Sequence, residues 1–208
     1  LIAELMDKGL VDGVTTSSAV VGHEMAGALD RVKMCSAADL GFDPAFMPRS
    51  GVFEFTRLSR EQLDTLRKEM VLDEDLLEKG EKADGRFVIK AAGNMAYPMG
   101  LRTENLAGEL LVICKAYGLP FEIVAGWGAD RRTMIGKGAE KGLPVLVSIP
   151  QMVGSGHVGM AVGDSISLFE RSMRVAMMLE SADVIIESAV ALTQEIHDGP
   201  FECYTGHG

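Results

Sequence analysis

The chain has 208 residues, of which 47% are hydrophobic and 24% are charged, and its formal net charge is −10. This length suits one α/β domain with a substantial core. The acidic balance argues against nucleic-acid binding, because proteins that follow phosphates concentrate Lys and Arg on their surface. We therefore expect a small-molecule ligand and no nucleic-acid partner.

The cysteines and the apolar runs predict the cellular location of the protein. Cys35, Cys114 and Cys203 are odd in number and lack a CxxC pair, so neither a disulfide framework nor a zinc knuckle is indicated. A reducing, cytoplasmic location fits this usage. No apolar stretch approaches the roughly 18 residues that a membrane span needs, so no membrane partner is expected. The sequence begins at Leu1, inside a predicted helix, and not at a methionine, which suggests a trimmed chain.

The first half of the chain predicts helices, one short strand and a long connection. Apolar spacing indicates a helix over residues 1–8, followed by a strand over 10–16 and a helix over about 19–29 with Ser17 or Ser18 as its N-cap. Gly and Pro residues between 39 and 54 predict an irregular connection. Ser59 and Gln62 have the spacing of a capping box at the start of an amphipathic helix. The acidic stretch over 72–85 is interpreted as a solvated helix end and turn.

The second half alternates between apolar runs and helix patterns. Strands are expected over 86–92, 121–126, 143–150 and 182–189, with helices starting at Thr103, spanning Asp130 to Lys141, and running from an Asp164 cap to about residue 179. Apolar runs without alternation indicate strands covered on both faces. The predicted fold is α/β: a three-layer, mostly parallel Rossmann-like sheet flanked by helices. We expect a single nucleotide-binding-like domain over 1–208.

The turns after the predicted strands are the candidate ligand sites, because ligands of parallel sheets bind beyond the carboxyl ends of the strands. Small or glycine-rich residues follow the first strand and the 143–150 strand. Gly154, Gly156 and Gly159 match GxGxxG, although the expected ribose-binding acid about 20 residues on is replaced by Glu187, 28 residues beyond Gly159. The alternative reading is a packing turn. The candidate cofactor-binding residues are Thr15, Thr16, Ser17, Ser18, Gly154, Ser155, Gly156, Gly159 and Glu187.

The candidate catalytic residues are two histidines and a lysine. His157 and His23 lie in predicted strand-to-helix turns, where an imidazole can carry a proton or simply pack. Lys137 has a glycine-rich neighbourhood and could form an imine, although solvated lysines are commoner. Trp127 either stacks on a flat ligand or caps the core. The methionines Met173, Met177 and Met178 follow helical spacing and are expected to fill the core.

The C-terminal segment supplies an alternative. His197, Asp198 and His207 could ligate a metal, although their spacing matches no compact metal motif, so the primary prediction has no metal. A metal-assisted hydrolase or lyase is therefore kept as a second hypothesis.

Two segments carry a family resemblance. LIAELMDKGLVDGVTTSSAVVGHEMAGAL, and KGLPVLVSIP with its following Gly-Ser turn, resemble the deoxyhypusine synthase superfamily. The resemblance implies a Rossmann-like fold that binds NAD between subunits of a homotetramer, and polyamine chemistry through a lysine imine. By this resemblance, residues 15–18 form the first cofactor turn, and Gly154 and Ser155 form the second. The chain lacks the family's acidic residue in that turn and the glycine triplet before its lysine, so a different reaction is expected.

The leading hypothesis is an NAD-binding, cytoplasmic homo-oligomer that acts as an oxidoreductase or transferase on a small amine or amino acid derivative. A non-catalytic oligomeric ligand-binding protein is the third hypothesis.

Overall fold

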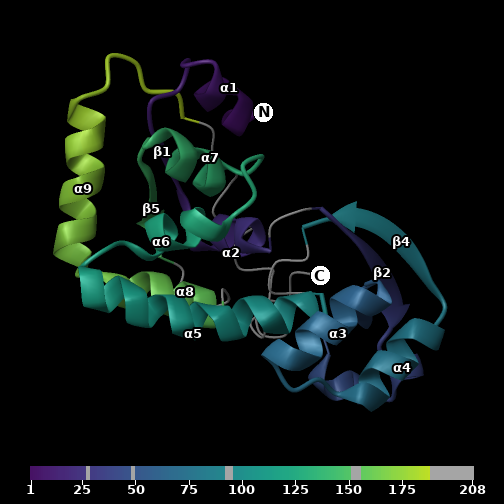
Figure 1. Ribbon diagram of the computed structural model, residues 1–208. Helices are drawn as coiled ribbons and strands as arrows, with labels where there is room; N and C mark the ends of the chain where they lie inside the picture. The colour runs from purple at the N-terminus through teal and green to yellow at the C-terminus, as the bar shows by residue number, and fades with distance from the viewer. Residues whose placement is uncertain (27–28, 48–49, 92–95, 151–155, 188–208) are drawn as a thin grey trace. The chain divides into compact units, whose positions relative to one another are not determined.

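The chain forms two compact units, seen in Figure 1. The computed structural model describes residues 1–26, 29–47, 50–91, 96–150 and 156–187. Of these, unit 1 contains 1–26, 103–150 and 156–187, and unit 2 contains residues from 29 to 102. Unit 2 is therefore an insertion in the sequence of unit 1, a division that the sequence patterns did not indicate.

Unit 1 surrounds a small parallel sheet with helices. Strands β1 (Val14–Ser17) and β5 (Val145–Ile149) pair in parallel, with Val14 opposite Val145. Side chains from both strands and from most of the helices, among them Val21, Phe121 and Val158, form one buried core. The helices are α1 (Ile2–Asp7), α2 (Ser18–Met25), α5 (Met99–Tyr117), α6 (Phe121–Gly128), α7 (Met134–Lys141), α8 (Gly156–Ser165) and α9 (Leu168–Glu180), and the first turn of α5 belongs to unit 2.

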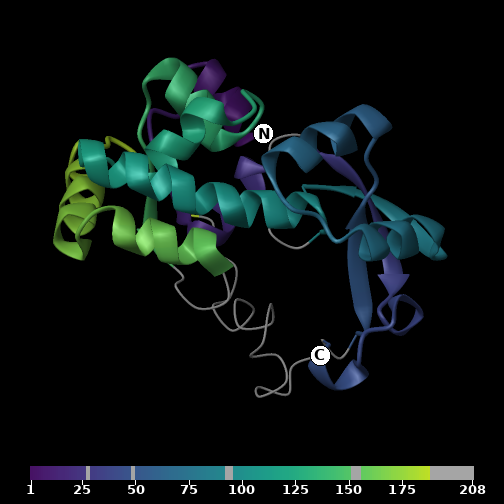
Figure 2. The same cartoon turned by 60° about the horizontal axis from the view of Figure 1, so that its bottom comes forward.

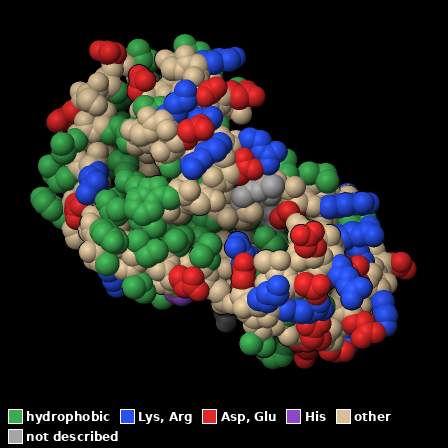
Figure 3. All heavy atoms as spheres, in the orientation of Figure 1, with side chains coloured by type: hydrophobic (Ala, Val, Ile, Leu, Met, Phe, Trp, Pro, Cys, Tyr) green, Lys and Arg blue, Asp and Glu red, His purple; other side chains and the backbone are tan. Residues whose placement is uncertain are grey.

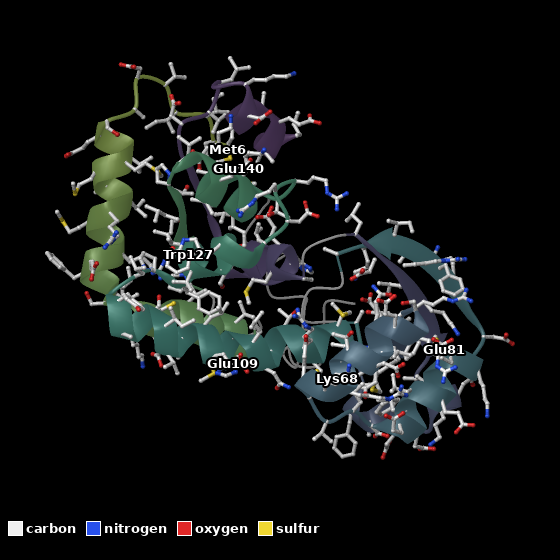
Figure 4. The ribbon with its side chains drawn as sticks, viewed as in Figure 1. Met6, Lys68, Glu81, Glu109, Trp127 and Glu140 are labelled. Carbon is white, nitrogen blue, oxygen red and sulfur yellow. The ribbon has the colours of Figure 1, made fainter. Side chains whose placement is uncertain are left out.

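Side chains fix the start of α7 and its position beside its neighbours. The hydroxyl of Thr133 accepts a hydrogen bond from the Gly136 N–H at 3.1 Å. The carboxylate of Glu24, on α2, accepts from the N–H groups of Met134 and Ile135 at 3.0 and 2.9 Å. These bonds occupy amides that a helix start leaves unpaired. Helix α7 also contacts α1. Figure 4 labels Met6 on α1 and Glu140 on α7 near this contact.

The free edge of β5 is closed by a buried ion pair. Arg171 on α9 and Glu122 on α6 lie 2.5 Å apart, and both side chains are almost fully buried. Glu122 accepts from the Val147 N–H at 2.8 Å, and Arg171 donates to the Val147 carbonyl at 3.0 Å. The N–H and C=O of one strand residue point to the same edge. The pair therefore takes the place of a neighbouring strand and leaves no open edge at Val147.

Unit 2 is an antiparallel sheet with two helices. Its strands are β2 (Asp30–Ser36), β3 (Val52–Thr56) and β4 (Gly85–Lys90), in the order β3-β2-β4. Helices α3 (Arg60–Glu69) and α4 (Glu74–Lys82) supply Leu66 and Leu77 to a core with Cys35 and Phe55. Two short 3₁₀ helices, η1 (Ala38–Leu40) and η2 (Pro44–Phe46), lie between β2 and β3.

A buried lysine joins the sheet of unit 2 to α4. The ammonium of Lys33 donates to the carbonyls of Gly80, Glu81 and Ala83 at 2.8 to 2.9 Å. These three bonds use all three ammonium protons and satisfy carbonyls that the end of a helix leaves unpaired. Gly80 is required at this contact, because a Cβ there would lie 2.4 Å from the Phe55 ring.

Several sequence predictions are confirmed. The chain is α/β. Strand β5 falls inside the strand predicted over 143–150, and β4 overlaps the strand predicted over 86–92, beginning one residue earlier at Gly85. The strand predicted over 10–16 is present in part as β1. Ser59 and Gln62 make both bonds of the capping box at the start of α3.

Other elements differ from the predictions. Residues 121–126, predicted as a strand, form α6, because Phe121, Val124 and Ala125 then point together into the core. Asp164 lies inside α8, and Ser167 is the residue that caps α9. Residues 182–187, predicted as part of a strand, form none, and 188–189 lie outside the described residues. Strand β3 begins inside the connection over 39–54 that was predicted to be irregular, and α4 lies inside the acidic stretch over 72–85. Strand β2 was not predicted.

These differences change the architecture. The described residues form a parallel pair and a separate antiparallel sheet, so no clear three-layer Rossmann sheet is present among them. At the β5 edge the physical reason is that Glu122 and Arg171 already occupy the Val147 backbone groups that a further strand would need.

Breaking the pair should destabilise the protein strongly. We expect Arg171→Met to lower the free energy of unfolding by about 3–5 kcal/mol, because it leaves the Glu122 charge buried without its partner. Arg174→Met, on the same helix, removes only a partly exposed pair with Glu170 and should cost less than about 1 kcal/mol. Urea unfolding followed by circular dichroism measures both values, and equal losses would contradict this role of Arg171.

Candidate functional site

The two turns that the sequence singled out start from one edge of the parallel sheet. Ser17 at the end of β1 is opposite Ile149 at the end of β5. The chain enters α2 directly after Ser17, and α8 follows β5 in the sequence. The helices pack closely, since a Cβ at Gly22 of α2 would lie 3.7 Å from Val158 of α8. The structure therefore brings the start of α2, which follows β1, and the start of α8, which follows β5, into one region.

The predicted cofactor residues are distributed over this region. Thr15, Thr16 and Ser17 belong to β1, and Ser18 is the buried first residue of α2. Gly156 and Gly159 belong to α8, with Gly159 buried. Gly154 and Ser155 lie outside the described residues. Glu187 is exposed on the segment that follows α9.

A carboxylate that the sequence analysis missed lies at the start of α8. Figures 1 and 2 both show α5 running beside α8. The carboxylate of Glu104, on α5, accepts a hydrogen bond from the His157 N–H at 2.5 Å through Oε2. Its other oxygen, Oε1, is buried and has no hydrogen-bond partner among the described residues. Glu104 therefore keeps one acceptor for which the described residues supply no donor group.

The same contact orients the His157 ring. Its Nδ1 lies 3.0 Å from the backbone carbonyl of Glu104. A carbonyl only accepts, so this geometry assigns the proton to Nδ1 and leaves Nε2 as the basic nitrogen of the neutral ring. The His157 side chain is exposed, and no hydrogen bond from the described residues reaches Nε2. This arrangement suits a group that accepts or returns a proton.

Two glycines make room for Glu104 and His157. Gly156 has φ +58°, and a Cβ there would lie 2.7 Å from both carboxylate oxygens of Glu104. A Cβ at Gly108, one turn after Glu104 on α5, would lie 3.0 Å from His157 Cε1. The i, i+4 spacing of Glu104 and Gly108 on one helix face is the signal that could have pointed to this site.

The residues present fit different ligand groups at the two helix starts. At α8 the Glu104 carboxylate lies where a phosphate was expected, so the site suits a hydroxyl or an ammonium and repels an anion. At α2, Ser17 is the N-cap residue and its side chain makes no capping bond. Such a helix start suits an anion such as a phosphate.

The other predicted catalytic residues lie elsewhere in unit 1. His23 is in the last turn of α2, roughly 7 Å along the helix axis from Ser18. Lys137 pairs with Glu140 at 2.5 Å and Asp7 at 3.3 Å. The Glu140 carboxylate raises the pKa of Lys137, with Asp7 adding to the shift. A lysine that forms imines needs a lowered pKa, so this environment favours an ion pair.

The remaining residues do not add to the site. Trp127, labelled on α6 in Figure 4, is 54% exposed and does not cap the core. The proposed metal ligands His197, Asp198 and His207 lie outside the described residues. Within the part of the chain that the structure describes, no group of three His, Cys, Asp or Glu side chains could hold a metal ion.

Comparison with known protein families, curated proteins and solved structures gives no match for this chain. None of the helices among the described residues has the length and apolar character needed to cross a bilayer.

Gly156 provides a test of the contact. We expect Gly156→Ala to destabilise more than Gly142→Ala, because both positions have positive φ but only the first would displace Glu104. The difference should be about 1.5–3 kcal/mol, the range for a hydrogen bond to a charged group. In a Glu104→Ala background it should vanish. Denaturant unfolding of the four variants and their parents measures this, and a difference that persists without Glu104 would show another cause.

Proposed function

We propose that unit 1 is an NAD-binding enzyme domain that acts on a small amine, with its site where β1 and β5 end. The observation that carries this proposal is the Glu104–His157 contact beside the sheet edge, which combines an unpartnered carboxylate oxygen with an exposed basic nitrogen. The parallel pairing of β1 and β5 and the resemblance of their sequences to the deoxyhypusine synthase superfamily support the cofactor.

Each group has a separate role in this proposal. The junction of β1 and α2 binds the cofactor phosphates through the amides and hydroxyls of Thr15, Thr16 and Ser17, and Ser18, which is buried, lies behind it. Glu104 attracts the substrate ammonium by charge, and its buried Oε1 accepts a hydrogen bond from the ammonium once the groups that cover it move aside. His157 Nε2 takes the proton that the amine loses, while the Glu104 carbonyl keeps Nδ1 protonated. NAD, when bound, supplies a hydride acceptor.

Calorimetric titration of the full chain tests the proposal. NAD should give measurable heat at millimolar concentration, and 1,4-diaminobutane serves as the amine probe. Glu104→Gln should weaken binding of the diamine by about 10-fold or more, the loss of a charged hydrogen bond, and leave NAD binding unchanged. Glu109→Gln, an exposed position on the same helix labelled in Figure 4, is the control.

Three outcomes separate the hypotheses. The absence of heat with NAD would remove the cofactor, and equal effects of Glu104→Gln and Glu109→Gln would remove the amine site. Binding of both ligands without NADH formation would favour a ligand-binding protein over an enzyme.

The proposed protein is also a homo-oligomer, and α9 provides a surface for this. Arg171 is the buried residue of α9, whereas Leu168, Phe169, Met173 and Met177 are exposed; Met178 is partly buried beside Gly13. Met173 and Met177, predicted to fill the core, are 46% and 63% exposed, and Phe169 is 76% exposed. Figure 3 shows hydrophobic side chains gathered on this side of unit 1. We call Leu168, Phe169, Met173 and Met177 the apolar flank.

A second copy of the chain suits the apolar flank. An aromatic side chain such as Phe169 buries roughly 150–250 Å² when it is fully covered. Together with the three aliphatic side chains of the apolar flank, it provides a part of the roughly 800 Å² that each partner buries in a stable interface. The neighbouring charges of Glu170 and Arg174 pair with each other at 2.7 Å, so two copies can meet here although the chain carries −10. Exposed apolar patches of this kind mark interaction sites.

Charge placed on the apolar flank should dissociate the oligomer. We expect the wild-type chain to sediment as a dimer or larger species and Phe169→Glu/Met177→Glu to sediment as a monomer, because carboxylates cannot be buried there without partners. Val71→Glu, at a position that is 92% exposed in unit 2, should leave the mass unchanged. Analytical ultracentrifugation gives the masses, and a monomeric wild-type protein at all concentrations would contradict the interface.

A further inference from the structure

Two arginines of unit 2 share one aromatic ring. The guanidinium carbons of Arg31 and Arg57 lie 4.3 and 5.6 Å from the centroid of Phe87, and the ammonium of Lys33 lies 5.8 Å from it. Arg31 and Lys33 alternate along β2, and Phe87 is opposite Lys33 on β4, so these side chains extend from one face of the sheet. Arg57 follows β3 and donates its N–H to the Arg31 carbonyl at 2.9 Å.

The charges at this ring are not balanced by carboxylates. Lys33 uses its three protons on carbonyls of α4. Arg31 and Arg57 are exposed and form no ion pair with the described residues, a property they share with Arg60, Lys68 and Arg86 of the same unit but not with Arg67, Lys79, Lys82, Lys90 and Arg102. Asp30 is adjacent to Arg31 in β2, but strand alternation places its side chain on the opposite face. Three cations around one ring repel one another unless an anion joins them.

Unit 2 is close to neutral, in contrast to the rest of the chain. Residues 29–102 hold 12 of the 20 Lys and Arg residues and 13 of the 30 Asp and Glu residues, so they carry a net charge of only −1 out of −10. In Figure 3, Lys and Arg side chains gather along the part of unit 2 where Figure 1 places β4. The net charge of the whole chain therefore does not describe this surface.

We propose that Arg31 and Arg57 bind the phosphate of a nucleotide-type ligand at the Phe87 surface. Each guanidinium offers parallel N–H donors that match phosphate oxygens, and a phosphate dianion offsets both charges, which a single carboxylate does not. Ile89, the cross-strand neighbour of Arg31, is 65% exposed and extends from the same face. It supplies the apolar contact for a base beside the phosphate. This site lies within unit 2 and does not depend on the function proposed for unit 1.

The chemistry of the ligand is tested by titrating the full chain at low ionic strength with three probes. Inorganic phosphate and AMP should both bind, AMP more tightly because of its base, and adenosine should bind more weakly than either. Ile89→Ser should lower the affinity for AMP to that for phosphate and leave the affinity for phosphate unchanged. Phosphate binding as tight as AMP binding in the wild-type protein would restrict the site to free phosphate and overturn the nucleotide assignment. Adenosine that binds as tightly as AMP would overturn the phosphate assignment.

Arginine variants test the residues. Arg57→Met should weaken phosphate and AMP by about 10-fold or more, as expected for the loss of a charge-assisted hydrogen bond. Arg86→Met is the matched control, because Arg86 is exposed on the opposite face of β4 and should change binding less than twofold. Thermal unfolding confirms that both variants are folded, and Arg57→Lys, which keeps the charge, should recover part of the affinity.

Binding of AMP to unit 1 would not be affected by Arg57→Met. The proposal therefore concerns only the part of the AMP binding that Arg57→Met removes. Equal binding by the Arg57→Met and Arg86→Met proteins, or no binding by the wild type, would overturn the proposal.

Discussion

Unit 1 depends on one buried guanidinium that bonds to several neighbouring elements, although Arg171 Nε and Glu122 Oε2 have no hydrogen-bond partner among the described residues. Arg171 donates to the Glu122 carboxylate, to the carbonyls of Val147 and Val162, and to the Ser165 hydroxyl, so one side chain ties α9 to α6, β5 and α8. The Ser165 hydroxyl in turn accepts from the Phe121 N–H at the start of α6. A buried charge is tolerable only with such a set of partners. The network therefore requires several helices to be in position at once, which couples the packing of the core to the sheet.

The same network determines where a site can form. By ending the sheet at β5, it leaves β1 and β5 as the parallel pair, so chemistry at a strand end has to be built from α2 and α8 and from the helix that runs beside α8. Glu104 and His157 come together there because α5 and α8 approach closely at glycines. The candidate site thus follows from helix packing more than from a nucleotide-binding loop, which explains why a carboxylate occupies the position expected for a phosphate.

The sequence predicted the parts of the fold that depend on neighbouring residues. The capping box of Ser59 and Gln62 is a local interaction, and the apolar run around Val147 has few alternatives to a buried strand. The segment at Phe121 has the same apolar character, and only the core it meets decides that it is a helix. Strand β2 was missed because Lys33 interrupts its apolar pattern and is buried only through carbonyls of α4, nearly 50 residues later. Glu104 was missed for a similar reason, since its partner lies 53 residues away.

The insertion of unit 2 has a consequence for synthesis on the ribosome. Strand β1 pairs Val14 with Val145, so it must wait until most of the chain has emerged. The sheet of unit 2 pairs residues between Asp30 and Lys90, which are all available much earlier. Pairing between distant segments is slow, because the loop must close before contacts form. The nascent chain is therefore expected to complete its middle first, while an amino-terminal strand remains exposed to chaperones and to other chains.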